Sequence, residues 1–293
     1  MAQLSVDQAL MKAKSHVKKD EVIEAKKLYQ VILQAFPKNL RAQQGLVALN
    51  KTRQNNVTQS PPQEAIDQLV NLYNQRQFSV VVKQAQDITN QYPEAIIVWN
   101  ILGASAAEIG MLDEAIEAYK KAISLKPDYA DAYYNMSNAL KDQGKLEKAI
   151  KYYNKVISLN PNYADAYYNM GVALKNQGKL DQAITAYNKV LSLKPDYADA
   201  YSNMGNALKV QGKLDEAIEA YNKAISLKPD YADTYSNMGV TLQEQGKLEK
   251  AIVAYNKAIS LKPNFAYAYY NMGNALKDQG KLDEAIEAYN KAI

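Results

Sequence analysis

Apolar residues from about residue 96 onward recur at helical spacing, in two short stretches per repeat. In the repeat that begins at Ala130, the residues Tyr133, Met136 and Leu140 fall on one side of a helix. A second stripe follows the i, i+3, i+4, i+7 pattern and contains Leu146, Ala149, Ile150, Tyr153, Val156 and Ile157. The pattern predicts two amphipathic helices in each repeat.

The breaks between these helices return with a fixed period. Gly144 lies between the two stripes, where glycine can end a helix in the left-handed conformation without a Cβ penalty. Asp128 is placed to cap the first helix of its repeat. Prolines that stop the second helix are spaced 34 residues apart, at Pro93, Pro127, Pro161, Pro195, Pro229 and Pro263. One repeat is therefore predicted to be helix, tight turn, helix and break.

Two antiparallel helices cannot bury both of their apolar faces, so each hairpin is expected to pack on the next. Small residues recur where helix backbones would approach closely, at Ser137, Gly171, Gly205, Gly239 and Gly273 in the first helices and Ala149, Ala183, Ala217, Ala251 and Ala285 in the second. The predicted fold is all-α, an open solenoid held together by interfaces between neighbouring repeats.

The two ends of the chain are less regular. Residues 1–50 are predicted to form a degenerate hairpin with an additional helix, and the polar residues 51–61 a linker. The array over 62–293 comprises a degenerate repeat with Arg76 at its turn, five regular repeats over 96–265 and an incomplete repeat over 266–293. The incomplete repeat would leave Ile286 and Ile293 uncovered, so we expect either a longer natural polypeptide or end-to-end association of copies.

The repeat resembles the tetratricopeptide repeat family. In residues 96–129 the family pattern is carried by Trp99, Leu102, Gly103, Gly110, Ala115, Tyr119, Ala122 and Pro127. Ala106 stands where the family usually has a large aromatic residue, and later repeats have leucine there. The resemblance implies a right-handed superhelix whose first helices line a concave groove.

Composition and charge narrow the possible functions. The chain is 47% hydrophobic and carries a formal net charge of +4, with 35 basic and 31 acidic residues mixed along it, so no nucleic-acid stripe is expected. It has no cysteine and a single histidine, His16, which has no recognisable catalytic partners. We expect no catalytic residue, metal or cofactor. No signal peptide or membrane span is recognisable, so a cytoplasmic location without membrane contact is the expectation.

The candidate site is a polar face of the first helices. Residues spaced i, i+4, i+7 and i+11 share one helix face, and in successive repeats this face carries asparagine. The asparagines are Asn135, Asn138, Asn169, Asn203, Asn206, Asn237, Asn271 and Asn274, flanked by Asp131, Asp165, Asp199 and Asp233. A carboxamide can both donate to and accept from a peptide backbone, and the aspartates would favour a basic ligand.

The sequence therefore predicts a non-enzymatic scaffold that binds an extended protein segment. The asparagine row is similar to that of O-linked N-acetylglucosamine transferases, in whose superhelix it holds the substrate backbone. Two alternatives stay open. The chain resembles arrays fused to bacterial glycosyltransferases, sulfotransferases and oxygenases, so it could be the substrate-recruiting arm of a larger enzyme, or it could be a self-associating spacer.

Overall fold

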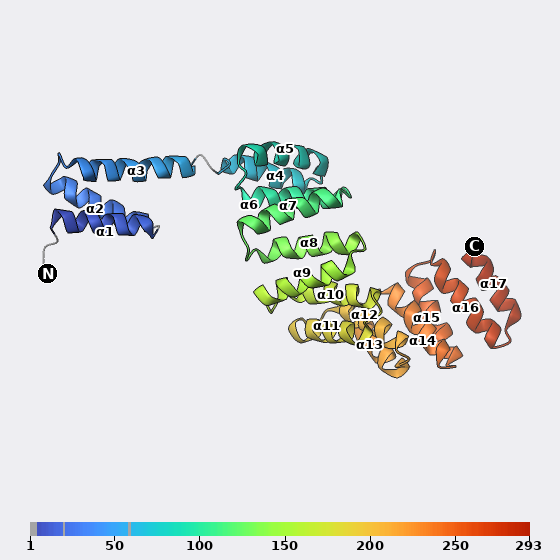
Figure 1. Cartoon of the computed structure of the whole chain (residues 1–293). Helices are drawn as coiled ribbons and strands as arrows, with labels where there is room; N and C mark the ends of the chain where they lie inside the picture. The colour runs from blue at the N-terminus through green and yellow to red at the C-terminus, as the bar shows by residue number, and fades with distance from the viewer. Residues whose placement is uncertain (1–4, 20, 58–59) are drawn as a thin grey trace. The chain divides into compact units, whose positions relative to one another are not determined.

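The computed structural model describes residues 5–19, 21–57 and 60–293, and within these ranges it contains helices and their connections but no strand (Figure 1). The tertiary contacts group into two compact units, residues 1–102 and 103–293, and the division falls inside a helix. The helices that begin in the first unit are α1 (Val6–Lys18), α2 (Val22–Ala35), α3 (Leu40–Val57), α4 (Gln63–Asn74), α5 (Phe78–Gln91) and α6 (Ile96–Glu108).

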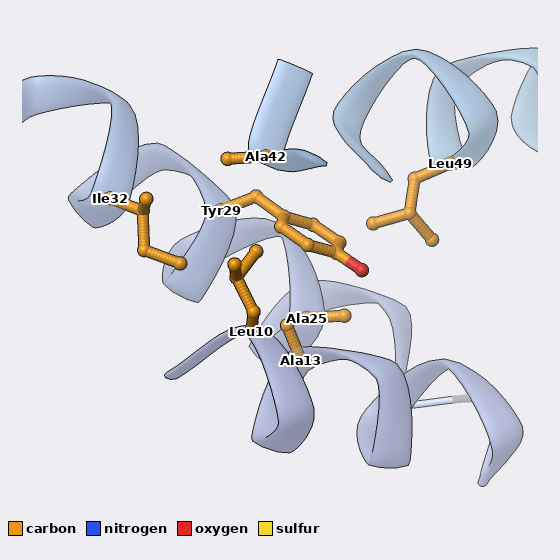
Figure 2. Packing of buried hydrophobic residues seen from close by; sticks show 7 residues of the cluster. All are labelled: Leu10, Ala13, Ala25, Tyr29, Ile32, Ala42 and Leu49. Atoms are coloured by element: carbon orange, nitrogen blue, oxygen red, sulfur yellow. The ribbon is translucent and has the colours of Figure 1, made fainter. Parts of the chain in front are cut away.

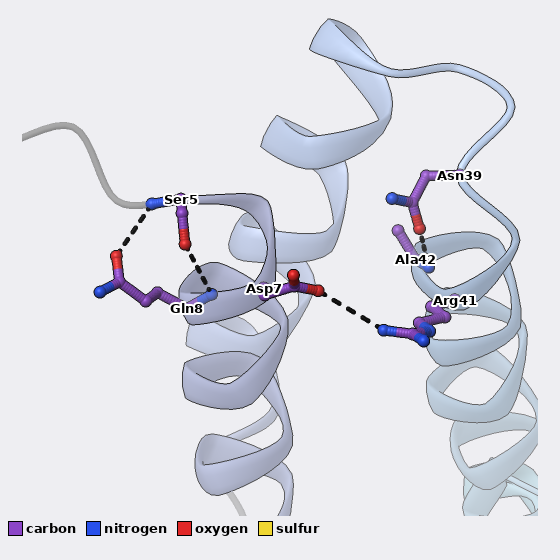
Figure 3. Close-up of polar contacts among 6 residues, drawn as sticks. All are labelled: Ser5, Asp7, Gln8, Asn39, Arg41 and Ala42. Atoms are coloured by element: carbon purple, nitrogen blue, oxygen red, sulfur yellow. Dashed lines mark hydrogen bonds and ion pairs between the residues drawn. The ribbon is translucent and has the colours of Figure 1, made fainter.

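The first three helices share a small core. Tyr29 of α2 is 3% exposed and lies between Leu10 and Ala13 of α1 and Ala42 and Leu49 of α3 (Figure 2). The start of α1 is fixed by a capping box, in which the Ser5 hydroxyl accepts from the Gln8 amide at 3.3 Å and the Gln8 side chain accepts from the Ser5 amide at 3.0 Å (Figure 3). Apolar burial and local capping together hold this part of the chain.

Residues 51–61 were predicted to be a linker without helix, and this prediction is wrong for most of them, because α3 continues to Val57. Residues 58 and 59 lie outside the described residues. Between α4 and α5 the turn residue Arg76 has φ of 58°, the left-handed conformation that glycine adopts at the later turns. Its backbone bonds also match those turns, since the Arg76 amide donates to Tyr73 at 2.9 Å and the Gln77 amide to Leu72 at 3.0 Å.

The second unit is a stack of helix hairpins. Over residues 130–293 each predicted pair forms, with a first helix, a turn and a second helix that pack on one another. The first helices are α8 (Ala130–Asp142), α10 (Ala164–Asn176), α12 (Ala198–Val210), α14 (Ala232–Glu244) and α16 (Ala266–Asp278). The second helices are α7 (Leu112–Leu125), α9 (Leu146–Leu159), α11 (Leu180–Leu193), α13 (Leu214–Leu227), α15 (Leu248–Leu261) and α17 (Leu282–Ala292).

Consecutive first helices contact one another, whereas within residues 103–293 consecutive second helices do not. The first helices therefore form the inner side of this stack and the second helices its outer side. Each first helix from α8 onward also packs against the second helix of the preceding repeat, so each of these hairpins rests on the one before it. In the last hairpin Ile286 and Ile293 are exposed, as the incomplete repeat predicts.

Tyrosines and glycines account for the close packing. Tyr119, Tyr153, Tyr187, Tyr221 and Tyr255 of the second helices are at most 2% exposed. A Cβ atom added at Gly205 would lie 2.6 Å from the Tyr221 ring, so glycine makes room for the tyrosine.

The expected cap at Asp128 is wrong, because the N-cap residue of α8 is Tyr129 and no side chain caps it.

The turns also fasten one repeat to the one before it. Gln143, in the turn after α8, donates through Nε2 to Asp113 at the start of α7 at 2.9 Å. The same contact joins Gln211 to Asp181 at 2.8 Å and Gln245 to Asp215 at 2.9 Å. The second-helix carboxylates therefore serve as hydrogen-bond acceptors between repeats as well as lying at positive helix ends.

Candidate functional site

The predicted polar face lies on the first helices of the second unit. Repeat positions are numbered here so that Ala130, Ala164, Ala198, Ala232 and Ala266 are position 1. Position 6 is then asparagine in every repeat, and these residues, called the amide row, are Asn135, Asn169, Asn203, Asn237 and Asn271. All five side chains are half-buried, so the amide row lies along the seams between successive first helices rather than on an open surface.

Asn169 and Asn203 of the amide row are bonded to the preceding repeat. Asn169 donates through Nδ2 to the Tyr134 hydroxyl at 2.8 Å and accepts from the Lys141 ammonium at 3.4 Å. Asn203 repeats this contact with Tyr168 at 2.9 Å and Lys175 at 3.0 Å. The sequence did not predict that these amides would join first helices to each other, and part of their hydrogen-bonding capacity is used in doing so.

The later members of the row lack these partners. Position 5 is tyrosine in α8 and α10, but it is Ser202 in α12 and Ser236 in α14. The Asn237 side chain has no hydrogen-bond partner among the described residues. In α16 the Nδ2 atom of Asn271 is buried and has no partner within the described part of the chain.

The other predicted asparagines, at position 9, hold buried tyrosines of the second helices. Asn138, Asn206 and Asn274 accept through Oδ1 from the hydroxyls of Tyr153, Tyr221 and Tyr289, at 2.5, 2.9 and 2.8 Å. These asparagines therefore support packing within their own repeat. Position 9 is Val172 in α10, and the buried hydroxyl of Tyr187 has no partner in the described structure.

Three of the four predicted aspartates also have partners. Asp131 accepts from the Tyr163 hydroxyl at 3.2 Å, and Asp165 forms an ion pair with Lys194 at 3.2 Å. Burial raises the pKa of Tyr231, and the hydrogen bond between its hydroxyl and Asp199 raises it further. Asp233 is exposed and has no ion pair or hydrogen bond among the described residues. The four carboxylates therefore differ in whether a neighbouring side chain already pairs with them or a ligand could do so.

Aromatic rings close part of the inner face. Tyr134 stacks on Tyr163 with ring centroids 5.0 Å apart, and Tyr168 stacks on Tyr197 at 5.1 Å. Burial, together with Asp165 and neighbouring tyrosines, raises the pKa of Tyr197 to about 12. These rings cover the seams from α8 to α12, whereas the serines at position 5 leave α12 and α14 without such a ring.

Grooves on the outer side were not anticipated from the sequence. Successive second helices are separated by grooves of about 440, 640 and 700 Å³, floored by residues of the intervening first helix. The largest lies between α13 and α15 over Tyr235, Met238 and Leu242, with the exposed Val253 on its wall. The periodic Met and Leu stripe of the first helices, which the sequence predicts to be a packing face, also floors these grooves.

None of the described helices is long and apolar enough to cross a membrane. Among the same residues no three His, Asp or Glu side chains are grouped as they would be around a metal ion.

The family model for the TPR repeat matches residues 107–142, 137–178, 173–212, 205–246 and 242–280. The chain belongs to the TPR family. The matched repeats are those whose inner face carries the amide row, and the all-α fold of stacked hairpins agrees with the match. This fold supports a role as a protein–protein interaction scaffold.

Known proteins are similar to parts of this TPR chain. A peroxisomal targeting signal receptor of Candida albicans is 34% identical over 83 residues, which are 26% of this chain and 14% of the receptor. The chain thus spans only a small fraction of that relative. The crystal structure of MamA is 33% identical, with a TM-score of 0.51 over 54% of this chain and 92% of MamA. The structure of YrrB, described as a TPR protein with an unusual peptide-binding site, has a TM-score of 0.54 at 24% identity over 63% of this chain and 95% of YrrB, which shows the fold alone.

Proposed function

We propose that this TPR protein binds an extended segment of another protein along the inner face of its second unit. The observation that carries the proposal is the amide row, which runs through five consecutive first helices and is half-buried rather than sealed in the core. A carboxamide can donate to a peptide carbonyl and accept from a peptide N–H, so such a row suits an extended backbone irrespective of its side chains. Asn237 is half-buried and its side chain has no hydrogen-bond partner among the described residues, so its carboxamide can bond a ligand without breaking an internal bond.

Negatively charged aspartates on the same face favour a positively charged ligand. Asp131 and Asp233 are exposed on the inner side. A carboxylate forms its strongest hydrogen bonds with cationic donors, so lysine or arginine in the bound segment is favoured. The ligand is therefore an extended, basic protein segment.

The relatives agree with a role in protein recognition. The similar stretch of the Candida albicans protein belongs to a receptor for a peroxisomal targeting signal, and YrrB is described as having a peptide-binding site. The identity of the ligand of this chain does not follow from them.

The proposal is tested with an immobilised library of random peptides and two matched variants. Asn237→Ala is expected to weaken binding about tenfold, while its free energy of unfolding stays within about 0.5 kcal/mol of wild type because the side chain has no partner to lose. The control is Asn222→Ala, which removes an exposed amide from the outer side of the neighbouring repeat. Binding that survives Asn237→Ala but is lost with Asn222→Ala would place the ligand in the outer grooves and contradict the proposal.

A further inference from the structure

The groove between α13 and α15, called here the α13–α15 groove, differs from the other outer grooves in one wall residue. Position 22 of each repeat lies on the exposed side of the second helix, and from α9 to α17 it is polar in every helix except α15. The residues at this position are Lys151, Thr185, Glu219, Val253 and Glu287. Val253 is 69% exposed, so the apolar floor of the groove continues onto its wall.

Unpaired charges of opposite sign lie on the two walls. On α15, Lys250 and Lys257 lie about one turn before and after Val253, at i, i+3 and i+7, so the three residues share one helix face. Glu219 lies on the facing wall, which is formed by α13. Neither lysine and not Glu219 forms an ion pair in the described structure.

The other charged residues that line the groove have partners within the protein. Asp215 forms an ion pair with Lys247 at 3.8 Å, and Glu249 accepts from the Gln279 side chain at 3.0 Å. The charges left for a ligand are therefore the two lysines of α15 on one side and Glu219 on the other.

The floor of the groove favours a helix as its occupant. Tyr235, Met238 and Leu242 of α14 lie at i, i+3 and i+7, which is a stripe about 10 Å long at the rise of an α-helix. Met238 and Leu242 offer no hydrogen bond to a peptide backbone, so an extended segment lying on them would leave N–H and C=O groups unpaired. A helix pairs these groups internally and can present an apolar stripe of the same spacing.

We propose that the α13–α15 groove is a docking site for an amphipathic helix of a partner protein, one that carries acidic residues along one edge of its apolar stripe. The stripe lies over Tyr235, Met238 and Val253, and the acidic edge faces the lysines of α15. A basic residue on the opposite edge is favoured by Glu219. Opposite charges on the two walls thus determine which way round the helix lies. This surface is separate from the inner face, and the inference does not depend on the ligand proposed there.

The neighbouring groove, between α11 and α13, has walls that disfavour the same helix. Its α13 wall carries Glu216 and Glu219, at the positions where α15 has Lys250 and Val253. Two carboxylates there would repel an acidic edge and remove the apolar part of the wall. Its floor is again Tyr, Met and Leu from one first helix, so the wall residues decide which groove accepts the helix.

An exchange of the two wall residues tests the proposal. Lys250→Glu combined with Val253→Glu gives α15 the pair of side chains that α13 and α17 carry at the same positions, so the variant is expected to fold. The matched control is Gln182→Glu combined with Thr185→Glu, which places the same pair in the groove between α9 and α11. Circular dichroism and the urea midpoint of both variants are expected to stay close to wild type.

The probes are three fluorescent peptides of about 15 residues, each held helical by a side-chain lactam and measured by fluorescence anisotropy. The first has leucine at i, i+3 and i+7 with glutamate along one edge, the second has lysine in place of glutamate, and the third has the first composition in scrambled order. Wild type and the control variant are expected to bind the first at least about tenfold more tightly than the other two. The α15 variant is expected to bind the first at least about tenfold more weakly than wild type does.

Equal affinity of wild type for the glutamate and lysine peptides, no binding of any of the three, or unchanged affinity in the α15 variant would each overturn the proposal. None of these results bears on the inner face. Sedimentation velocity without peptide adds a further check. Self-association of wild type that the α15 variant abolishes would show that a second copy of this chain fills the groove, and would overturn the assignment to a partner protein.

Discussion

At the scale of single residues, the repeats act as internal comparisons, since the same position is surrounded by nearly the same neighbours. Tyr221 and Tyr187 are both fully buried at equivalent positions of adjacent second helices. The Tyr221 hydroxyl donates to Asn206 at 2.9 Å, but the Tyr187 hydroxyl has no partner in the described structure because Val172 replaces the asparagine. One exchange of side chain therefore decides whether a buried hydroxyl stabilises the repeat.

Removing each hydroxyl should consequently have different effects. Tyr221→Phe is expected to lower the free energy of unfolding by about 1 kcal/mol, because it leaves Asn206 without its donor. Tyr187→Phe is expected to be neutral or stabilising, since it removes a polar group that was buried without a partner. Urea denaturation of the two variants and wild type measures the difference, and equal losses would show that Tyr187 has a partner in solution.

At the scale of helices and turns, most of the architecture could be predicted from the sequence. The 34-residue spacing of prolines and the apolar stripes identify the hairpins because both depend on backbone geometry that the sequence sets locally. The cap at Asp128 and the linker over 51–61 were wrong, because α8 begins at Ala130 without a side-chain cap and polar residues after Asn50 continue α3. Polarity alone does not separate a solvated helix from a loop.

The candidate site was predictable only in part. The sequence indicates that the asparagines share one face, since helical spacing determines that. It does not indicate which of them are bonded, because the partner of Asn169 lies 35 residues earlier, on a neighbouring helix. The difference between Asn203 and Asn271 depends on the residue at position 5 of the preceding repeat, and this becomes visible only once the seams between helices are known.

The turn between α4 and α5 allows a prediction about backbone strain. Arg76 has φ of 58°, where a side chain costs about 1–2 kcal/mol that glycine avoids. Arg76→Gly is expected to stabilise this hairpin by about 0.5–1 kcal/mol, because the greater freedom of glycine in the unfolded chain offsets part of the gain.

Gly178→Ala, at a turn with φ of 74°, should destabilise its repeat by about 1 kcal/mol.

Hydrogen exchange of the amides of α4 and α5 measures the first effect, and urea denaturation the second. Slower exchange in Arg76→Gly together with a lower urea midpoint in Gly178→Ala is the expected pair of results. An unchanged Arg76→Gly protein would mean that the Arg76 side chain compensates for its backbone conformation.

At the scale of the whole molecule, burial of many tyrosines links stability to alkaline pH. Burial raises the pKa of Tyr187 and Tyr221 above the usual value of 10, and it raises that of Tyr197 to about 12. Between pH 10 and pH 12 the unfolded chain ionises these phenols while the folded protein keeps them neutral. The unfolded state therefore binds fewer protons, and stability falls as the pH rises.

Below about pH 10 the tyrosines are expected to have no effect on the urea midpoint, and above it the midpoint should fall steadily. The phenolate absorbance should appear together with the loss of helix. Tyr187→Phe combined with Tyr221→Phe should make the decline shallower. Phenolate absorbance that appears well before helix is lost would contradict the burial of these side chains.

The proposed mode of binding is that the inner face of the TPR array holds an extended ligand by its backbone. It is tested most directly by measuring Kd for a peptide selected from the library in two altered forms, one with its side chains scrambled and one with N-methyl groups on its central amides. Scrambling is expected to change Kd by only about threefold, whereas N-methylation is expected to weaken binding more than about tenfold because it removes peptide N–H donors. Binding that tolerates N-methylation but is lost on scrambling would show that side chains, and not the backbone, are recognised.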